Sequence, residues 1–264
     1  MREPGIVARR ERGRGRQRSG RGEGRRRGGR QEGQKGEGAG SAWGEWIRTI
    51  VITIVLLVII RTFLVQTFVI TSGSMEDTLK VGDFLMVNRL ALGTELPLVP
   101  WRTPGYSEAR LGDVVVFDPA HEDDLMLVKR IVGMPMDTLE MRGKELYRNG
   151  ERQNEPFVIW SDFAGDHEHP MMEWQRDHLA PGVDPDTYRP TRDEWGPLVV
   201  PEDNFFMLGD NRDASLDSRY WGLIEDWRLT GRAMFFYYSY DRDSATPMAF
   251  VREARWERIG RRIR

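Results

Sequence analysis

Two serines separated by one glycine, Ser72 and Ser74, stand directly after an apolar stretch and are the first candidates for chemistry. Small residues around a serine let a second backbone approach closely, which a protease needs when a peptide must reach its nucleophile. A serine hydroxyl attacks a carbonyl only when a neighbouring base takes its proton. The pattern predicts a nucleophile that still needs a base, and a plain Ser-Gly-Ser turn is the simpler alternative.

Few residues of the chain could supply that base. There is no cysteine, and the four histidines lie in acidic, turn-like or inserted sequence: His121, His167, His169 and His178. Lysine is the remaining type, and Lys129 is the only lysine set inside an apolar run, LMLVKRIVG. Burial lowers a lysine pKa from about 10.4 by several units, so Lys129 is a plausible general base. The alternative is a lysine on the solvent face of a half-buried strand.

A third polar segment, LGDNRDASLDSRYWG at residues 208–222, follows another apolar run. It carries too many polar side chains for a simple turn, so they should interlock or line a site. Asp210, Asp213 and Asp217 could be oxygen ligands, but the spacing of a calcium loop is missing. A metal site here, or at the DHEH cluster of residues 166–169, is the weaker interpretation. We expect neither a metal nor a cofactor.

The elements that must position these residues are mostly β. From Phe68 to Tyr240 the chain has short runs rich in Val, Phe, Leu and Tyr, separated by turns. Asn149-Gly150 between two such runs predicts a type I′ hairpin. Residues 156–200 are acidic and rich in Pro and Trp, and we interpret them as an insertion without a predicted structure. The sequence therefore predicts a β-rich domain over residues 66–250.

The N-terminal part has a different composition. Residues 1–45 hold 13 Lys or Arg against 6 Asp or Glu, a net charge of +7, whereas the remainder holds 26 against 35, a net charge of −9. The head has too little apolar surface to offset the entropy of ordering, so we expect it to be disordered. Its Arg-Gly spacing also suits nucleic-acid phosphates, although a solvated basic tail explains it without them.

An uncharged run over residues 49–60 follows this head. A helix over residues 46–65 would rise about 30 Å, which is the thickness of a bilayer's hydrocarbon core. We therefore predict one transmembrane helix over residues 46–65, with a cleavable signal peptide and a buried soluble helix as alternatives. The positive-inside rule then places the head in the cytoplasm and the β-rich domain on the other side.

The C-terminal segment, residues 251–264, is strongly basic. Trp256, Ile259 and Ile263 are spaced by three and four residues, as on one face of a short amphipathic helix lying on a membrane surface. A frayed, solvated end is the equal alternative. The absence of cysteine excludes disulfides and thiol catalysis throughout the chain.

Taken together, the motifs SGSMEDTL, LVKRIVGMP and GDNRDASLDSRYWG, after one N-terminal anchor, resemble bacterial type I signal peptidase, the membrane-bound Ser/Lys enzyme that removes signal peptides. The resemblance covers roughly residues 46–240 and implies a signal-peptidase-like antiparallel β-sheet domain. It implies that Ser74 is the nucleophile and Lys129 the general base. The hydroxyl of Ser72 would join the Ser74 backbone N–H in the oxyanion hole.

The resemblance also implies supporting and substrate-binding residues. Ser215 would orient the lysine amine, and Asp217 and Arg219 would form an ion pair that supports the site. The implied substrate-binding residues are Phe68, Ile70, Met75, Leu79, Leu127 and Val128. Two positions depart from the family, which often has Pro where this chain has Asp77 and Gly where it has Met136. We expect those departures to change the local backbone and to leave the Ser/Lys pair intact.

The function implied is an endopeptidase at the outer face of the cytoplasmic membrane, in contact with lipid, that cuts secretory preproteins after small-x-small sequences. Its substrate would bind as an added strand near Ile70 and Leu127, and no nucleic acid would be involved. An alternative from another class is a single-pass membrane protein whose non-catalytic β domain binds a partner, with a basic head that binds lipid or nucleic acid. A self-cleaving Ser/Lys protease of the SOS-repressor type is a nearer alternative, but such proteins lack this anchor and the third motif.

Overall fold

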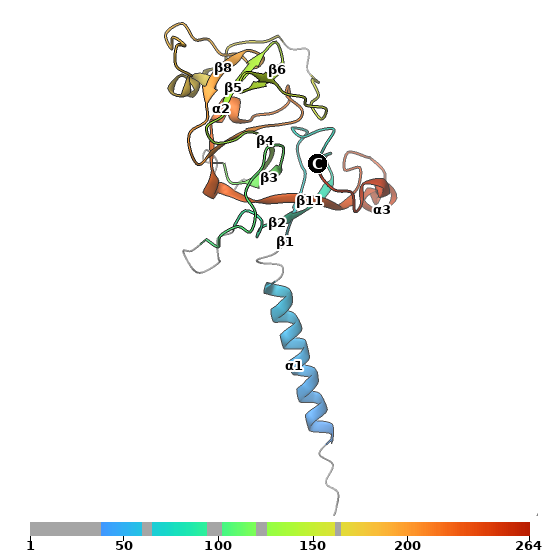
Figure 1. Ribbon diagram of the computed structural model, residues 1–264. Helices are drawn as coiled ribbons and strands as arrows, with labels where there is room; N and C mark the ends of the chain where they lie inside the picture. Colours follow the sequence, from blue (N-terminus) through green and yellow to red (C-terminus); the bar gives the residue numbers. More distant parts are fainter. Residues whose placement is uncertain (1–37, 60–64, 94–101, 120–125, 162–164) are drawn as a thin grey trace, which may run out of the picture. The chain divides into compact units, whose positions relative to one another are not determined.

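The computed structural model describes residues 38–59, 65–93, 102–119, 126–161 and 165–264 (Figure 1). The chain divides into two compact units, Met1–Arg48 and Thr49–Arg264. The long helix α1 runs over Gly38–Ile59, so it overlaps the predicted span of residues 46–65 but begins earlier. Residues 60–64 of that span, and residues 1–37 of the predicted head, lie outside the described residues. Within the described part of the chain, no helix combines the length and the apolar character needed to cross a membrane.

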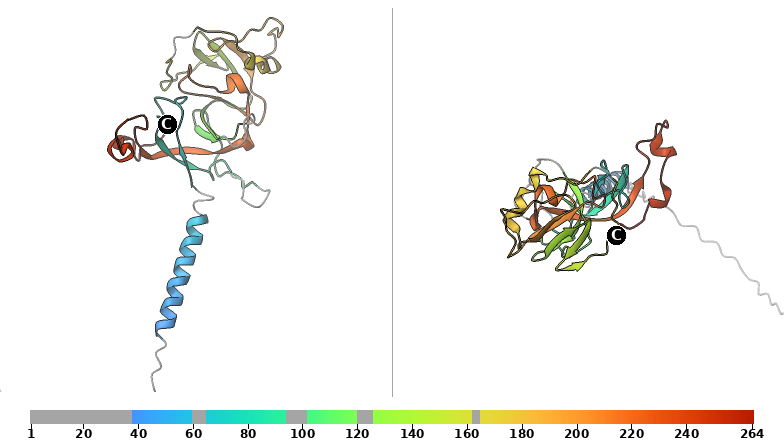
Figure 2. Two further views of the ribbon diagram at one scale, coloured as in Figure 1. Left: turned by 180° about the vertical axis from the view of Figure 1, so that it is seen from behind. Right: turned by 90° about the horizontal axis from the view of Figure 1, so that it is seen from above.

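Two antiparallel sheets form the β-rich part, which confirms the predicted antiparallel β fold of that part. The order of strands in the larger sheet is β1 (Val65–Val69), β2 (Asp83–Asn88), β11 (Leu229–Ser239), β3 (Val114–Phe117), β4 (Leu127–Gly133), β9 (Asn204–Leu208) and β10 (Ile224–Glu225). The order in the smaller sheet is β7 (Glu151–Arg152), β6 (Glu145–Arg148), β5 (Thr138–Arg142) and β8 (Trp195–Val199). The long strand β11 pairs with both β2 and β3 (Figures 1 and 2).

Short helical segments complete the described chain. They are η2 (Pro170–His178), α2 (Ser218–Trp221), η3 (Asp226–Arg228), α3 (Ala249–Arg252) and η4 (Trp256–Arg258). The segment η2 begins where the Nδ1 atom of His169 accepts a hydrogen bond from the backbone N–H of Met171. This cap satisfies one of the backbone donors that a helical segment leaves unpaired at its start.

The strand β3 shows why the larger sheet has apolar side chains on both faces. Its four residues are all buried. Val114 and Val116 belong to one apolar cluster, and Val115 and Phe117 belong to another. Because successive side chains of a strand point to opposite faces, an uninterrupted apolar run is what a strand covered on both sides requires.

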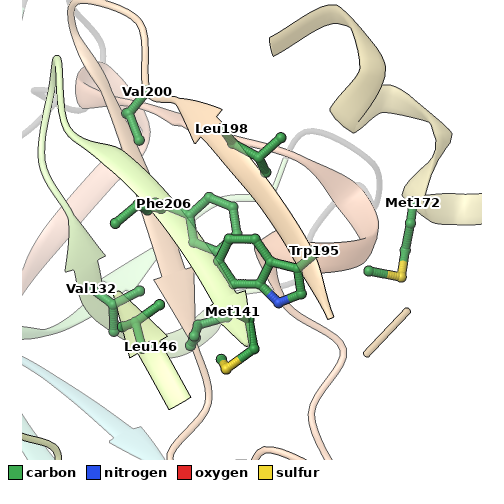
Figure 3. Close-up of a cluster of buried hydrophobic side chains, with 10 residues drawn as sticks. Val132, Met141, Leu146, Met172, Trp195, Leu198, Val200 and Phe206 are labelled. Atoms are coloured by element: carbon green, nitrogen blue, oxygen red, sulfur yellow. The ribbon is translucent and has the colours of Figure 1, made fainter. Parts of the chain in front are cut away.

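A third apolar cluster joins the two sheets (Figure 3). Val132 and Phe206 enter it from β4 and β9 of the larger sheet, and Met141 and Trp195 enter it from β5 and β8 of the smaller one. The Trp195 and Phe206 rings are stacked, with centroids 5.0 Å apart. Residues 156–200, which had no predicted structure, therefore contribute the strand β8 and part of this core.

The predicted hairpin at Asn149-Gly150 is confirmed. The turn joins β6 to β7, and Arg148 is the register partner of Glu151. Asn149 and Gly150 have φ angles of 54° and 81°, which are the positive values that a type I′ turn requires.

The C-terminal segment is neither an amphipathic helix nor a frayed end, so both interpretations of its sequence are wrong. Arg258 is buried, and its guanidinium forms an ion pair at 2.5 Å with Asp83, which is fully buried in β2. Further along, Arg262 forms a β-bridge with Phe235 of β11. The segment is folded because a buried carboxylate needs a charge partner, and Arg258 provides it from 175 residues further along the chain.

The two departures from the family pattern both fall on left-handed backbone. Asp77 has a φ of 79° and Met136 a φ of 68°. Proline is restricted to a φ of about −65°, so it could not adopt the backbone that Asp77 has here. Glycine adopts a positive φ without strain, which explains why it would suit the position of Met136.

Candidate active site

Ser74 lies in a tight loop between β1 and β2. The backbone N–H of Glu76 donates to the Gly73 carbonyl at 3.0 Å, and the N–H of Leu79 donates to the Met75 carbonyl at 2.7 Å. These two turns hold the loop next to β4, and the Ser74 side chain is buried to all but 8% of its surface. The hydroxyl is thus held in one place rather than on a mobile tip.

Lys129 projects from β4, whose register places it opposite Val115 of β3. Its Nζ donates a hydrogen bond to the Ser74 Oγ at 2.6 Å, and only 3% of Lys129 is exposed. The structure therefore brings together the two residues that the sequence singled out, which are 55 positions apart.

Burial lowers the pKa of the Lys129 amine from 10.5 to about 8. Removal of water from around the amine is the largest cause, because it penalises the charged form. The negative charge of Asp217 acts in the opposite direction, whereas the positive charge of Arg219 lowers the pKa further. With this pKa about a tenth of the amine is neutral at pH 7, and the neutral form is the one that can accept the serine proton.

The polar segment at residues 208–222 is bonded directly to the serine loop. The Asn211 backbone N–H donates to the Ser74 carbonyl at 3.1 Å. Gly209 lies so close that an added Cβ would stand 2.4 Å from the Ser74 carbonyl oxygen and 2.3 Å from the Ser215 Oγ. Only glycine fits there, so the backbone of this segment packs directly against the Ser74 carbonyl and helps to fix the position of Ser74.

Asp217 and Arg219 form the predicted ion pair at the base of the site. The Arg219 Nε and Nη2 donate to the two Asp217 carboxylate oxygens at 2.8 and 2.9 Å, and both side chains are fully buried. Burial raises the pKa of Asp217, but the charge and hydrogen bonds of Arg219 outweigh it and lower the pKa below its ordinary value. Asp217 also accepts the Gly209 N–H at 3.1 Å, which links the pair to the serine loop.

A second buried ion pair was not predicted from the sequence. The Arg130 Nε and Nη2 donate to the Asp210 carboxylate at 2.8 and 2.7 Å, and the Arg130 guanidinium stacks over the Phe157 ring at 3.8 Å. Arg130 follows Lys129 on β4, and Asp210 precedes Asn211. The sequence did contain a signal for this pair. Arg130 and Asp210 are opposite charges within two of the motifs, and a charged side chain that becomes buried needs a partner.

The two other predicted serines make weaker or no direct contact with Ser74 and Lys129. The Ser72 Oγ lies 3.4 Å from the Ser74 Oγ. The Ser215 Oγ is buried, and within the described residues no hydrogen bond joins it to Lys129. It lies near enough to Asp217 to help lower the pKa of that carboxyl. The structure thus places Ser215 beside Gly209 and the serine loop without a bond to the lysine amine that it was expected to orient.

A cleft of about 260 Å³ opens beside the pair. Of the predicted substrate-binding residues, Ile70, Met75, Leu127 and Val128 line it together with Ser72, Ser74 and Lys129. Phe68 and Leu79 do not line it, and both belong to the apolar cluster that contains Val114.

Three residues of the cleft wall were missed by the sequence analysis. They are Val69, Thr71 and Met126, which stand next to predicted residues in the chain. Strand alternation alone could not separate them from the side chains behind the wall. Across the residues that the structure describes, no three His, Asp or Glu side chains gather as a metal site.

Buried serine and lysine side chains in hydrogen-bond contact beside a cleft are the arrangement of a Ser/Lys hydrolase. A family model described as "Signal peptidase, peptidase S26" matches residues 43–238. The chain therefore belongs to the S26 signal peptidase family. It is a serine endopeptidase.

Similar proteins include several that are named as signal peptidases. Signal peptidase I of Pseudomonas aeruginosa is 33% identical, with 70% of this chain and 69% of that protein covered. Signal peptidase I of Bacillus licheniformis is 32% identical, over 75% of this chain and 89% of that protein. A crystal structure of a signal peptidase I from Enterococcus faecalis is 27% identical and covers 48% of this chain and 97% of that one, with a TM-score of 0.32.

Proposed function

We propose that this protein removes signal peptides from secretory preproteins, with Ser74 as the nucleophile and Lys129 as the general base. The observation that carries the proposal is the 2.6 Å contact between the Lys129 Nζ and the Ser74 Oγ in a buried setting. Family membership supports the substrate class, since similar proteins carry the name signal peptidase I.

The proposed reaction begins with neutral Lys129. The amine takes the proton of the Ser74 hydroxyl while the Oγ forms a bond to the scissile carbonyl carbon. The lysine then gives this proton to the leaving amine as the carbon–nitrogen bond breaks, which leaves an acyl-enzyme on Ser74. A water molecule, deprotonated by the same amine, attacks the ester carbon, and the proton returns to the Ser74 Oγ as the signal peptide is released.

The negative charge that develops on the carbonyl oxygen needs donors. We propose the Ser74 backbone N–H and the Ser72 hydroxyl for this role. Two facts support Ser72: its Oγ lies 3.4 Å from the attacking oxygen, and it is exposed to the cleft side of the loop. Ser215 and the Asp217–Arg219 pair act indirectly in this proposal, by holding the loop and the lysine in position.

The substrate is proposed to bind as an extended strand between residues 69–71 and residues 126–128, which both border the cleft. A cleft of about 260 Å³ has room for few side chains. Its apolar wall at Ile70, Met75 and Val128 suits small apolar side chains, consistent with a cut after small-x-small sequences.

We also propose that residues 46–65 anchor the enzyme in the cytoplasmic membrane, with the catalytic part on the outer face. The apolar side chains of α1 support this, because Ile50, Ile54 and Leu57 are each more than half exposed and face no protein core. Apolar side chains around a whole helix are stable only in an apolar environment. The charge difference between residues 1–45 and the remainder agrees with this orientation.

The experiment that tests the function is incubation of the full chain, solubilised in detergent, with a purified preprotein. We expect a single cut after a small-x-small sequence, located by mass spectrometry of both products. Ser74→Ala protein prepared in the same way is the matched control and should give no product. An intact preprotein after prolonged incubation with the unaltered chain, or a cut elsewhere, would refute the proposal.

The rate should depend on pH through Lys129. Because its pKa is about 8 and the neutral amine is the reactive form, kcat/KM should rise about tenfold per pH unit up to pH 8 and level off above it. The measurement is kcat/KM for one preprotein between pH 5 and 10, with the folded state followed by circular dichroism at each pH. A rate that stays level from pH 8 down to pH 5 would exclude a lysine base.

A further inference from the structure

A hollow of about 470 Å³ lies beside the part of the serine loop that follows Ser74. Asp77 and Thr78 of the loop form one wall, and Phe157 contributes to another. The C-terminal segment forms the remainder with Arg261, Arg262 and Arg264. We call this space the arginine hollow. It shares no lining residue with the cleft.

The arginine hollow carries an uncompensated positive charge. Arg261, Arg262 and Arg264 are exposed, and within the described part of the chain their guanidinium groups have no hydrogen-bond or ion-pair partner. Arg258, which also borders the hollow, is neutralised by Asp83. The single acidic side chain of the lining is Asp77, so the side chains of the three free arginines and Asp77 sum to a charge of +2.

The walls of the hollow are fixed, although its arginine tips are free. The Arg130 Nη2 donates to the Thr78 Oγ1 at 3.3 Å and to the main-chain carbonyl of Arg264 at 3.2 Å. The Ile263 backbone N–H donates to the Met234 carbonyl at 2.9 Å, and the Ile263 side chain packs on the cluster that contains Met75. Figure 1 marks this end of the chain with a C. The arginines are therefore presented from a rigid base.

The hollow lies within reach of the reacting serine. Asp77 and Thr78 follow Ser74 by three and four residues, and the two turns at 73–76 and 75–79 keep that stretch compact. Residues joined by such a turn have Cα atoms less than about 7 Å apart. An extended peptide advances about 3.3 Å per residue, so two to four residues beyond the scissile bond span the distance from Ser74 to the hollow.

We propose that the arginine hollow is a subsite for the leaving chain, and that it favours Asp or Glu at the second to fourth positions after the cut. This inference rests on the proposed function, since it assumes that the residues before the cut occupy the cleft. With the cleft on one side of Ser74 filled, the residues after the cut leave across the turn that Asp77 and Thr78 form. There they meet three guanidinium groups, which pair well with carboxylates.

The test uses three preproteins that differ only at positions two to four after the cut, where they carry acidic residues, lysines or serines. In about 0.05 M salt, we expect kcat/KM for the acidic preprotein to exceed that for the lysine preprotein on the order of tenfold, mainly through KM, and to converge in about 1 M salt. The double variant Arg261→Glu/Arg262→Glu should reverse the order. Arg252→Glu, which changes an exposed arginine of α3 away from the hollow, should leave the ratio as it is.

Equal rates for the acidic and lysine preproteins, or a ratio that the double variant leaves unchanged, would overturn the subsite. A second outcome would also overturn the subsite. If the double variant changes kcat/KM equally for all three preproteins, and only in vesicles containing phosphatidylglycerol, the arginines contact lipid. The serine preprotein separates the two proposals. If the serine preprotein is cut but the acidic and lysine preproteins have equal kcat/KM, only the subsite proposal is refuted. If no form of the enzyme cuts the serine preprotein, the proposed function is refuted as well.

Discussion

Ser74→Ala is expected to lower preprotein cleavage on the order of a million-fold, as removal of the nucleophile does in other serine hydrolases. The change deletes one oxygen atom and with it the acceptor of the Lys129 amine. Lys129→Met should have a similar effect, because it keeps the length of the side chain and removes the base. The measurement is kcat/KM by quantitative detection of the released mature chain.

Both variants should remain folded, since the core clusters around the site are not altered. The matched control is Ser244→Ala, which changes a serine between β11 and α3, outside the site, and should retain full activity. Denaturant midpoints of all forms show whether a loss of rate reflects unfolding. Wild-type cleavage by either Ser74→Ala or Lys129→Met would contradict the proposed pair.

The largest loss of stability is expected from Asp217→Asn. The change retains the shape of the side chain but leaves the fully buried Arg219 guanidinium without its countercharge. Loss of one member of a buried ion pair costs about 3–5 kcal/mol. The free energy of unfolding at pH 7, from denaturant titration with an unchanged slope, measures this loss.

The matched control is Glu145→Gln, which breaks a surface pair with Arg152 whose side chains are 44% and 63% exposed. That change should cost less than about 1 kcal/mol. The pKa of Asp217 is below its ordinary value of 3.8 in the folded state, so its contribution is complete above pH 3.8 and disappears as the pH falls through the folded-state pKa. A loss at pH 7 no larger than that of the control would contradict the assigned role of the pair.

Local sequence patterns predicted several strands and one turn correctly. Short apolar runs became the strands β2, β3, β4 and β9, and Asn149-Gly150 became the hairpin turn. Such features depend on side-chain alternation and on backbone preferences of single residues, which a sequence displays directly. The meeting of Ser74 and Lys129 needed more than pattern, and it was implied by the family resemblance.

Contacts between distant residues could not be read in the same way. Trp256, Ile259 and Ile263 have helical spacing, yet Ile263 packs on the sheet cluster and Arg258 is held by Asp83. The C-terminal segment folds against the sheet because the buried Asp83 of β2 needs a cation. No residue near Arg258 in the sequence indicates this contact. In the same way, alternation could not show that Val69 and Met126 line the cleft whereas Phe68 and Leu79 do not.

The pairing of Asp83 with Arg258 has a consequence for folding during synthesis. Synthesis proceeds from the N-terminus, and the partner of this early carboxylate is 175 residues behind it. The same holds for Arg130, whose contact with Arg264 closes over 134 residues. A nascent chain that has reached the end of β11 therefore still lacks Arg258, and Asp83 gains this charge partner only when synthesis has passed that residue.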